Sequence, residues 1–184
     1  MYEVEMKFRV DDSAALKATL AELGCMPDSA CEEFDRFFQH PSRDFVQTDE
    51  CLRIRRRTLA DGGVEQSLTY KGPKVDTATK TRREIEMPID GSPQWFELLE
   101  ALGFHEKATV RKQRRYGSLT FNGQHVEVLL DFLPDLDEHF VELEAIAEEN
   151  EVAEKRRLVL DLAAKLGLTE SIRTSYLGLV SEKK

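Results

Sequence analysis

The chain has 184 residues, of which 41% are apolar and 33% are charged, a composition typical of a globular protein rich in ionic groups. The length suits one domain over residues 1–184 with a substantial core. Its 26 basic and 35 acidic residues give a net charge of −9, which argues against general binding to nucleic acid or to an anionic membrane.

The charge is unevenly distributed along the chain. Residues 1–50 carry 5 basic and 12 acidic residues (−7), residues 51–120 carry 14 and 9 (+5), and residues 121–184 carry 7 and 14 (−7). A basic middle segment between two acidic ends therefore needs an explanation.

The chain shows no sign of export or membrane insertion. Charges at Glu3, Glu5 and Lys7 argue against a signal peptide, and no apolar run is long enough to span a bilayer. The three cysteines lack CxxC spacing and the four histidines are scattered, so a zinc site is not expected. We therefore expect a reduced, cytoplasmic protein.

Alternation of apolar and polar residues predicts mostly strands. In residues 2–10, Val4, Met6 and Phe8 fall on one face and the charged residues on the other. Hairpin signals at Asp61-Gly62-Gly63 and Asn122-Gly123 separate further strands. The predicted strands span residues 2–10, 51–58, 64–71, 81–89, 109–121, 125–132 and 139–147.

Helices are predicted between these strands. Asp11 and Asp12 before a leucine stripe indicate a helix over 12–23, and Ser92-Pro93 indicates a helix start that leads to a stop at Gly103. Residues 151–166 form a third helix that ends at Gly167, and a short helix is expected around 171–180.

One combination of a strand and a helix occurs three times along the sequence. A strand with two carboxylates on one face leads into a helix with a glycine stop, at Glu3/Glu5, at Glu84/Glu86 and at Glu142/Glu144. This repeat indicates a fold and does not by itself indicate chemistry.

The charged strand faces allow two interpretations. They either face water on a solvated sheet, or they line one cavity if the sheet curls with these faces inward. Buried charges need a partner, and a metal-bound polyphosphate would satisfy both signs, since carboxylates bind Mg²⁺ or Mn²⁺ and arginine and lysine bind phosphate oxygens. Spacing alone leaves both interpretations open.

The ordered motifs resemble the CYTH superfamily, also called triphosphate tunnel metalloenzymes, over essentially the whole chain. The opening ExExK motif is Glu3-Val4-Glu5-Met6-Lys7. The Tyr70-Lys71-Gly72-Pro73 block and Ser175-Tyr176 resemble most the class IV adenylyl cyclase (CyaB-like) branch. The remaining matching blocks are Leu52-Arg53-Ile54-Arg55, Arg82-Arg83-Glu84-Ile85-Glu86, Lys112-Gln113-Arg114, Leu130-Asp131 and Phe140-Val141-Glu142-Leu143-Glu144.

The resemblance implies an α+β fold, an eight-stranded antiparallel β-barrel or tunnel with flanking helices, that binds a triphosphate with Mg²⁺ or Mn²⁺. It implies catalytic roles for Glu5, Lys7 and Lys112. Arg82 is preferred to Arg83 as a phosphate ligand because strand alternation places it on the same face as Glu84 and Glu86. The favoured role for those two glutamates is to brace the arginines. The implied metal ligands are Glu3, Glu5, Asp131, Glu142 and Glu144. The implied phosphate ligands are Lys7, Arg53, Arg55, Lys71, Arg82, Lys112 and Arg114.

The resemblance leaves the reaction open. The first expectation is conversion of ATP to cyclic AMP and pyrophosphate, and the alternative is hydrolysis of inorganic, thiamine or nucleoside triphosphate. Glu144 makes the last strand look more like the triphosphatases, and the polar loop expected at 74–81 shows no base-reading motif. A non-catalytic polyphosphate- or nucleotide-binding module is a further alternative, and a homodimer is a possible assembly.

Overall fold

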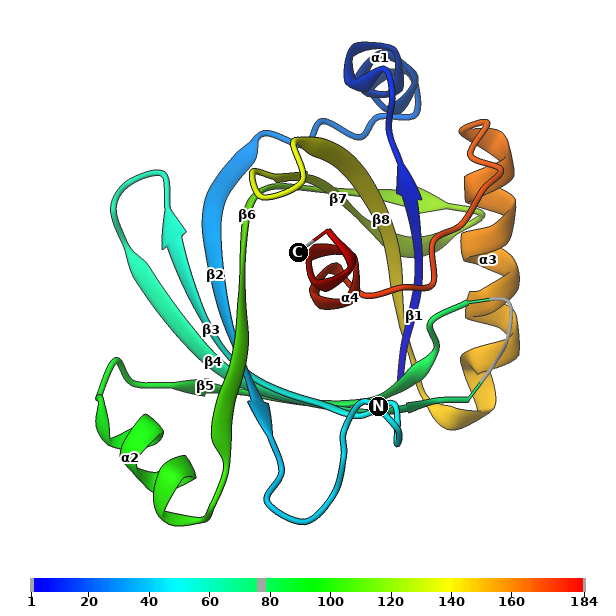
Figure 1. Ribbon diagram of the computed structural model, residues 1–184. Helices are drawn as coiled ribbons and strands as arrows, with labels where there is room; N and C mark the ends of the chain where they lie inside the picture. Colours follow the sequence, from blue (N-terminus) through cyan, green and yellow to red (C-terminus); the bar gives the residue numbers. More distant parts are fainter. Residues whose placement is uncertain (1, 76–78, 184) are drawn as a thin grey trace.

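The computed structural model describes residues 2–75 and 79–183 as a closed barrel with helices outside it (Figure 1). All neighbouring strands are antiparallel, and their order around the barrel is β1-β5-β4-β3-β2-β6-β7-β8, with β8 pairing back to β1. The strands are β1 Tyr2–Arg9, β2 Ser29–Gln39, β3 Cys51–Leu59, β4 Val64–Lys74, β5 Arg82–Ile89, β6 His105–Phe121, β7 Gln124–Leu133 and β8 Glu138–Ala147. This confirms the expected eight-stranded antiparallel barrel with flanking helices.

The helices follow three of the strands and end the chain. They are α1 Ser13–Glu22, α2 Gln94–Ala101, α3 Val152–Lys165, which a short 3₁₀ turn at Glu149–Glu151 precedes, and α4 Tyr176–Glu182. Gly24, Gly103 and Gly167 follow α1, α2 and α3 with positive φ angles, as the predicted glycine stops require. Within the described residues, no helix is long and apolar enough to cross a membrane.

The main apolar core lies outside the barrel. The side chains of Val4, Met6 and Phe8 on β1 point outward and pack against α1 and α3, for example against Leu20 and Leu162. Figure 1 shows α3 alongside β1. The alternation of β1 therefore places Glu3, Glu5 and Lys7 on the inner face, so the inward-facing interpretation of the charges is correct for this strand.

The strand β2 was not predicted. Its apolar residues occupy both faces, with Phe34 and Phe38 on one face and Phe37 on the other, which hides the alternation. The strand completes the barrel between β3 and β6, and it contributes two buried carboxylates to the interior, Glu33 and Asp35.

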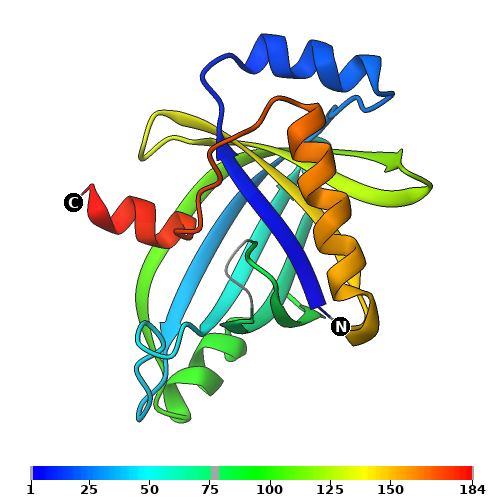
Figure 2. The ribbon, with the colours of Figure 1, turned by 90° about the vertical axis from the view of Figure 1, so that its right-hand side faces the viewer.

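The C-terminal helix begins later than expected. The prediction of a helix around 171–180 is wrong at its start, because residues 171–175 run along β1: Phe8 bridges to Ser171, and the Ile172 N–H donates to the Lys7 carbonyl (2.7 Å). The Ser175 side chain then accepts from the Gly178 N–H and caps α4. Figures 1 and 2 together show α4 at one mouth of the barrel, where Tyr176 and Val180 pack against Phe37 and Phe140.

Candidate active site

The inside of the barrel is a charged cavity of about 800 Å³. Strand register explains its composition, because opposite charges on neighbouring strands stand directly opposite each other: Asp35 faces Arg55, Arg114 faces Asp131, and Lys71 faces Glu84. The acidic residues that line the cavity include Glu3, Glu5, Asp35, Glu84, Glu86, Glu142 and Glu144, and the basic ones include Arg53, Arg55, Lys71, Lys80, Arg82, Lys112 and Arg114.

Three carboxylates form a group with the geometry of a cation site. Each of Glu3, Glu5 and Glu144 offers an oxygen, and these oxygens lie within 4.8 Å of one another. The pairing of β1 with β8 places Glu5 opposite Glu144. Oxygen ligands at this spacing suit a hard divalent cation such as Mg²⁺ or Mn²⁺.

The electrostatics of the three-carboxylate group also fit a cation. Burial, followed by the charges of Glu3, Glu142 and Glu5, raises the pKa of Glu144 well above its ordinary value. Burial also raises the pKa of Glu3, although Lys71 opposes the shift. Among the described residues, Glu144 has no hydrogen-bond or ion-pair partner, and a bound cation would favour its ionised form.

The structure does not bring the other two predicted metal ligands into this group. The Arg114 guanidinium donates to both Asp131 oxygens (2.7 and 2.6 Å) and to Glu142 (2.5 Å). The Tyr176 hydroxyl donates to Asp131 as well (2.8 Å). Asp131 therefore holds Arg114 and Tyr176, and Glu142 lies between Arg114 and Lys80, 3.8 Å from the Lys80 ammonium.

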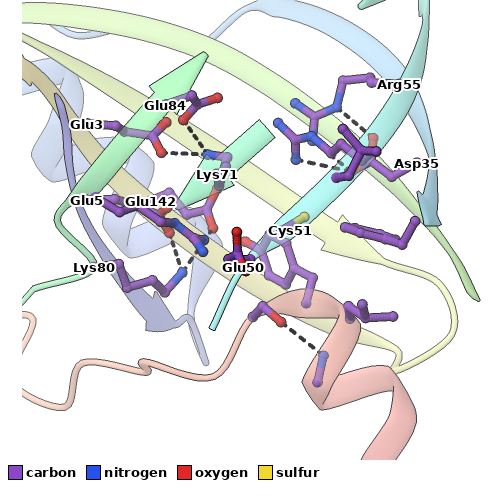
Figure 3. A pocket seen from close by; sticks show the side chains of 18 of the residues that line it. Glu3, Glu5, Asp35, Glu50, Cys51, Arg55, Lys71, Lys80, Glu84 and Glu142 are labelled. Atoms are coloured by element: carbon purple, nitrogen blue, oxygen red, sulfur yellow. Dashed lines mark hydrogen bonds and ion pairs between the residues drawn. The ribbon is translucent and has the colours of Figure 1, made fainter. Parts of the chain in front are cut away.

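The predicted phosphate ligands are mostly held by carboxylates. Arg55 donates to both oxygens of Asp35 (2.6 and 2.7 Å), and Figure 3 shows this pair across the cavity from Glu3 and Glu5. Lys71 contacts Glu3 at 2.5 Å and Glu84 at 2.6 Å. Burial lowers the pKa of Arg55, but Asp35 and Glu33 outweigh it and raise that pKa well above its ordinary value. These bases are fixed in position and remain charged.

Glu33 connects Arg55 to a further base, Lys112. It lies 3.0 Å from Arg55 and 3.0 Å from Lys112, and it accepts a hydrogen bond from Tyr116 (2.6 Å). Glu86 accepts from Thr69 (2.8 Å) and lies 3.9 Å from Arg53. Glu84 contacts Lys71, which is not one of the arginines that it was expected to brace.

Two arginines retain free donors. Arg53 and Arg82 each have a buried Nε–H without an acceptor in the described part of the chain. Within the same residues, no carboxylate lies within 4.0 Å of the Arg82 guanidinium, which is buried and lines the cavity. A buried cation with unused donors fits an anionic ligand such as a phosphate oxygen.

Lys7, like Asp131, differs from the other predicted site residues because it does not line the cavity. Its ammonium donates to the Thr174 carbonyl (2.6 Å) and lies 4.0 Å from the centre of the Tyr176 ring. Burial, with Lys80 nearby, lowers the pKa of Lys7 to about 7. Lys7 thus holds the C-terminal segment in this structure.

Sequence reasoning did not identify Lys80. The stretch 74–81 was expected to be a polar loop, but β4 extends to Lys74, and Thr79, Lys80 and Thr81 are buried; residues 76–78 lie outside the described part. The Lys80 ammonium forms an ion pair with Glu5. No local pattern indicates such a contact, since it joins residues 75 positions apart.

The closed barrel with a charged interior defines a β-tunnel protein. The family model described as the CYTH domain matches residues 1–176, and the chain belongs to this family. A Methanocaldococcus jannaschii protein named "Putative adenylate cyclase" is 34% identical over 182 residues, which cover 97% of this chain and 98% of that protein.

Solved structures share the fold over nearly the whole chain. The PH1819 protein of Pyrococcus horikoshii is 36% identical with a TM-score of 0.86, and the match covers 99% of each chain. A Vibrio parahaemolyticus protein described as a "putative adenylate cyclase" is 25% identical, with a TM-score of 0.78 and 98% of each chain covered. A Hippeastrum protein, described as a "putative adenylyl cyclase" with dominant triphosphatase activity, is 17% identical with a TM-score of 0.61 and shows likeness of fold alone; the match covers 99% of this chain and 96% of that one.

Proposed function

We propose that the protein is a metal-dependent enzyme that acts on a triphosphate inside the barrel, with conversion of ATP to cyclic AMP and pyrophosphate as the first candidate reaction. One observation supports this most directly: the three-carboxylate group Glu3/Glu5/Glu144 and the buried cations line the same cavity. A module that only binds polyphosphate would need the cations but would not need the three carboxylates.

The carboxylates would hold the metal and the bases would hold the phosphates. Glu3, Glu5 and Glu144 fit Mg²⁺ or Mn²⁺, which would supply charge neutralisation on the phosphate oxygens. Arg82 offers free donors, while Asp35 and Asp131 orient Arg55 and Arg114. Phosphoryl transfer depends mainly on such positioning and on stabilisation of charge, and prearranged bases supply both.

The cavity also has room for an organic group. Phe37, Phe45 and Leu52 line it together with Leu177 of α4, so part of its wall is apolar. In the cyclase reaction the ribose 3′-oxygen attacks the α-phosphorus and loses its proton, and the bond to pyrophosphate breaks. The name of the Methanocaldococcus jannaschii relative supports this reaction.

Hydrolysis is the second candidate, and Glu144 favours it. Glu144 is the second acidic residue of the Glu142/Glu144 pair on β8, a feature that makes this strand resemble that of the triphosphatases. Here Glu144 also completes the three-carboxylate group. In this reaction water attacks the terminal phosphorus, the bond from that phosphorus to the bridging oxygen breaks, and the products are orthophosphate and the corresponding diphosphate. The dominant triphosphatase activity described for the Hippeastrum protein shows that this fold supports hydrolysis.

Product analysis separates these reactions. The purified protein is incubated with ATP, thiamine triphosphate or inorganic triphosphate and with Mg²⁺ or Mn²⁺, and the products are resolved by chromatography. Cyclic AMP with pyrophosphate identifies the cyclase, and orthophosphate identifies the triphosphatase. Triphosphate binding without turnover of any of the three would refute the enzyme proposal.

Two variants test the division of roles. Glu144→Gln removes one of the three carboxylates, so Mn²⁺ affinity should fall by about tenfold or more, with loss of turnover. Arg82→Gln removes a guanidinium that has no ion pair among the described residues, so triphosphate affinity should fall by about tenfold while Mn²⁺ affinity stays the same. The exposed Glu97→Gln on α2 is the control. Calorimetric titrations measure both affinities, and equal effects of both variants on both ligands would contradict the assignment.

A further inference from the structure

Lys80 is held in place by its own backbone. Its N–H donates to the Glu5 carbonyl (2.9 Å), and the Val75 N–H donates to the Thr81 carbonyl (2.9 Å). The hydroxyls of Thr79 and Thr81 lie 2.6 Å apart, and Lys80 is only 3% exposed. The position of its ammonium inside the barrel is therefore a fixed feature of the fold.

The ammonium of Lys80 lies against the proposed metal site. It forms an ion pair with Glu5 and lies 3.8 Å from Glu142, as Figure 3 shows. Lys71 contacts Glu3 in a similar way, but Lys71 has a second carboxylate, Glu84, outside the three-carboxylate group. The second carboxylate of Lys71 lies at 2.6 Å, whereas that of Lys80, Glu142, lies at 3.8 Å, so the contact with Glu5 is the main ion pair of Lys80.

We propose that Lys80 is a built-in counter-ion that makes binding of the metal and of the triphosphate depend on each other. In the metal-free protein it neutralises Glu5. A divalent cation and an ammonium compete for the same carboxylate, so Lys80 weakens binding of a metal ion alone. Once the metal neutralises Glu5, the Lys80 ammonium lines the cavity without that partner, and phosphate oxygens become its acceptors.

This inference rests on the proposed metal site, and it predicts the direction in which Lys80 changes the affinity for each ligand. Lys80 opposes the metal alone and favours the metal together with the triphosphate, which is positive coupling between two ligands. Removal of its charge should therefore change the two affinities in opposite directions. A residue that only stabilises the fold would not produce this pattern.

The test compares Lys80→Gln with the native protein by calorimetric titration with Mn²⁺ alone and then with inorganic triphosphate in saturating Mn²⁺. We expect Mn²⁺ alone to bind about tenfold more tightly to Lys80→Gln, and triphosphate to bind about tenfold more weakly. Lys80→Arg keeps the charge and should behave as the native protein does. The exposed Lys165→Gln on α3 is the control for loss of one positive charge.

Thermal unfolding gives a second measurement that tolerates a destabilised variant. Without metal, Lys80→Gln should melt lower because Glu5 has lost its partner, and Mn²⁺ should raise its midpoint more than it raises the native midpoint. If Glu144→Gln leaves Mn²⁺ affinity unchanged, the proposed metal site itself is wrong. If Glu144→Gln weakens Mn²⁺ binding but Lys80→Gln binds Mn²⁺ no more tightly than the native protein, the metal site stands and the role of Lys80 is refuted.

Discussion

Asp35 shows how a single residue keeps a buried base in place. It is 3% exposed and accepts two hydrogen bonds from Arg55, with Arg53 at 3.4 Å. Burial raises the pKa of Asp35, but the charges of Arg55 and Arg53 outweigh it and hold the pKa below the ordinary value. Asp35 therefore stays ionised inside the barrel.

Asp35→Asn should destabilise the protein by about 3 kcal/mol at pH 7, because it removes one partner of a buried ion pair. A carboxyl whose pKa is lower in the folded state stabilises the protein above its unfolded pKa of about 3.9, and this contribution is lost as the pH falls through the folded value. The difference in the free energy of unfolding between the native protein and the variant should therefore shrink from pH 7 to pH 2. Urea unfolding at several pH values in this range measures that difference.

The exposed Asp161→Asn on α3 serves as the control and should change the stability by less than about 0.5 kcal/mol at every pH. A difference for Asp35→Asn that stays constant between pH 7 and pH 2 would contradict a lowered pKa for Asp35.

At the scale of elements, several polar contacts hold α4 at one mouth of the barrel, and Tyr176 makes one of them. The Tyr176 hydroxyl donates to the buried Asp131, and the Tyr176 ring packs edge-on against Phe140. Tyr176→Phe keeps the ring and removes only the hydrogen bond, so the free energy of unfolding should fall by about 1–2 kcal/mol. Chemical denaturation measures this change.

Tyr2→Phe is the matched control for the Tyr176 variant, since the Tyr2 hydroxyl has no partner among residues 2–75 and 79–183. It should leave the stability nearly unchanged. If both variants unfold at the same denaturant concentration, the Tyr176 hydroxyl does not anchor α4.

The periodicity of apolar and polar residues predicted most strands and helices because the two faces of each differ in polarity. Seven strands alternate clearly, and the glycine stops of α1, α2 and α3 stand where the sequence places them. The alternation pattern did not predict β2 because Phe37, an apolar residue, lies on the inner face of this strand, where it packs against α4. The start of α4 was not predicted because the backbone of Ser171 and Ile172 contacts β1, a contact between distant parts of the chain.

The site was predictable where strand parity determines it. The inward positions of Glu3, Glu5, Arg55 and Arg114 follow from alternation and from the family motifs. The division of the carboxylates into a three-carboxylate group and a set that braces the bases depends on barrel register, which one sequence does not reveal. For the same reason the contact of Lys80 with Glu5 required the three-dimensional structure.

At the scale of the whole molecule, barrel closure explains the uneven charge along the chain. β1 and β8 come from the two acidic ends and pair with each other, while β3 and β4 come from the basic middle. The protein therefore combines a net charge of −9 with a cavity that holds closely spaced cations. Such an interior suits a small polyanion, whereas the overall charge repels a long one.

This arrangement predicts selective stabilisation by a small polyanion with metal. At about 100 times the dissociation constant, a ligand that binds only the folded state adds about 2.7 kcal/mol, which raises the midpoint of a domain of this size by about 5–10 °C. Inorganic triphosphate with Mn²⁺ should give a shift of this order in a thermal scan. Single-stranded DNA and sulfate at matched ionic strength should give almost none, because the net charge of −9 repels a long polyanion and sulfate spans too few of the cavity's cations. Equal shifts with sulfate and with triphosphate would show that the barrel responds to general screening of charge and does not recognise a phosphate chain.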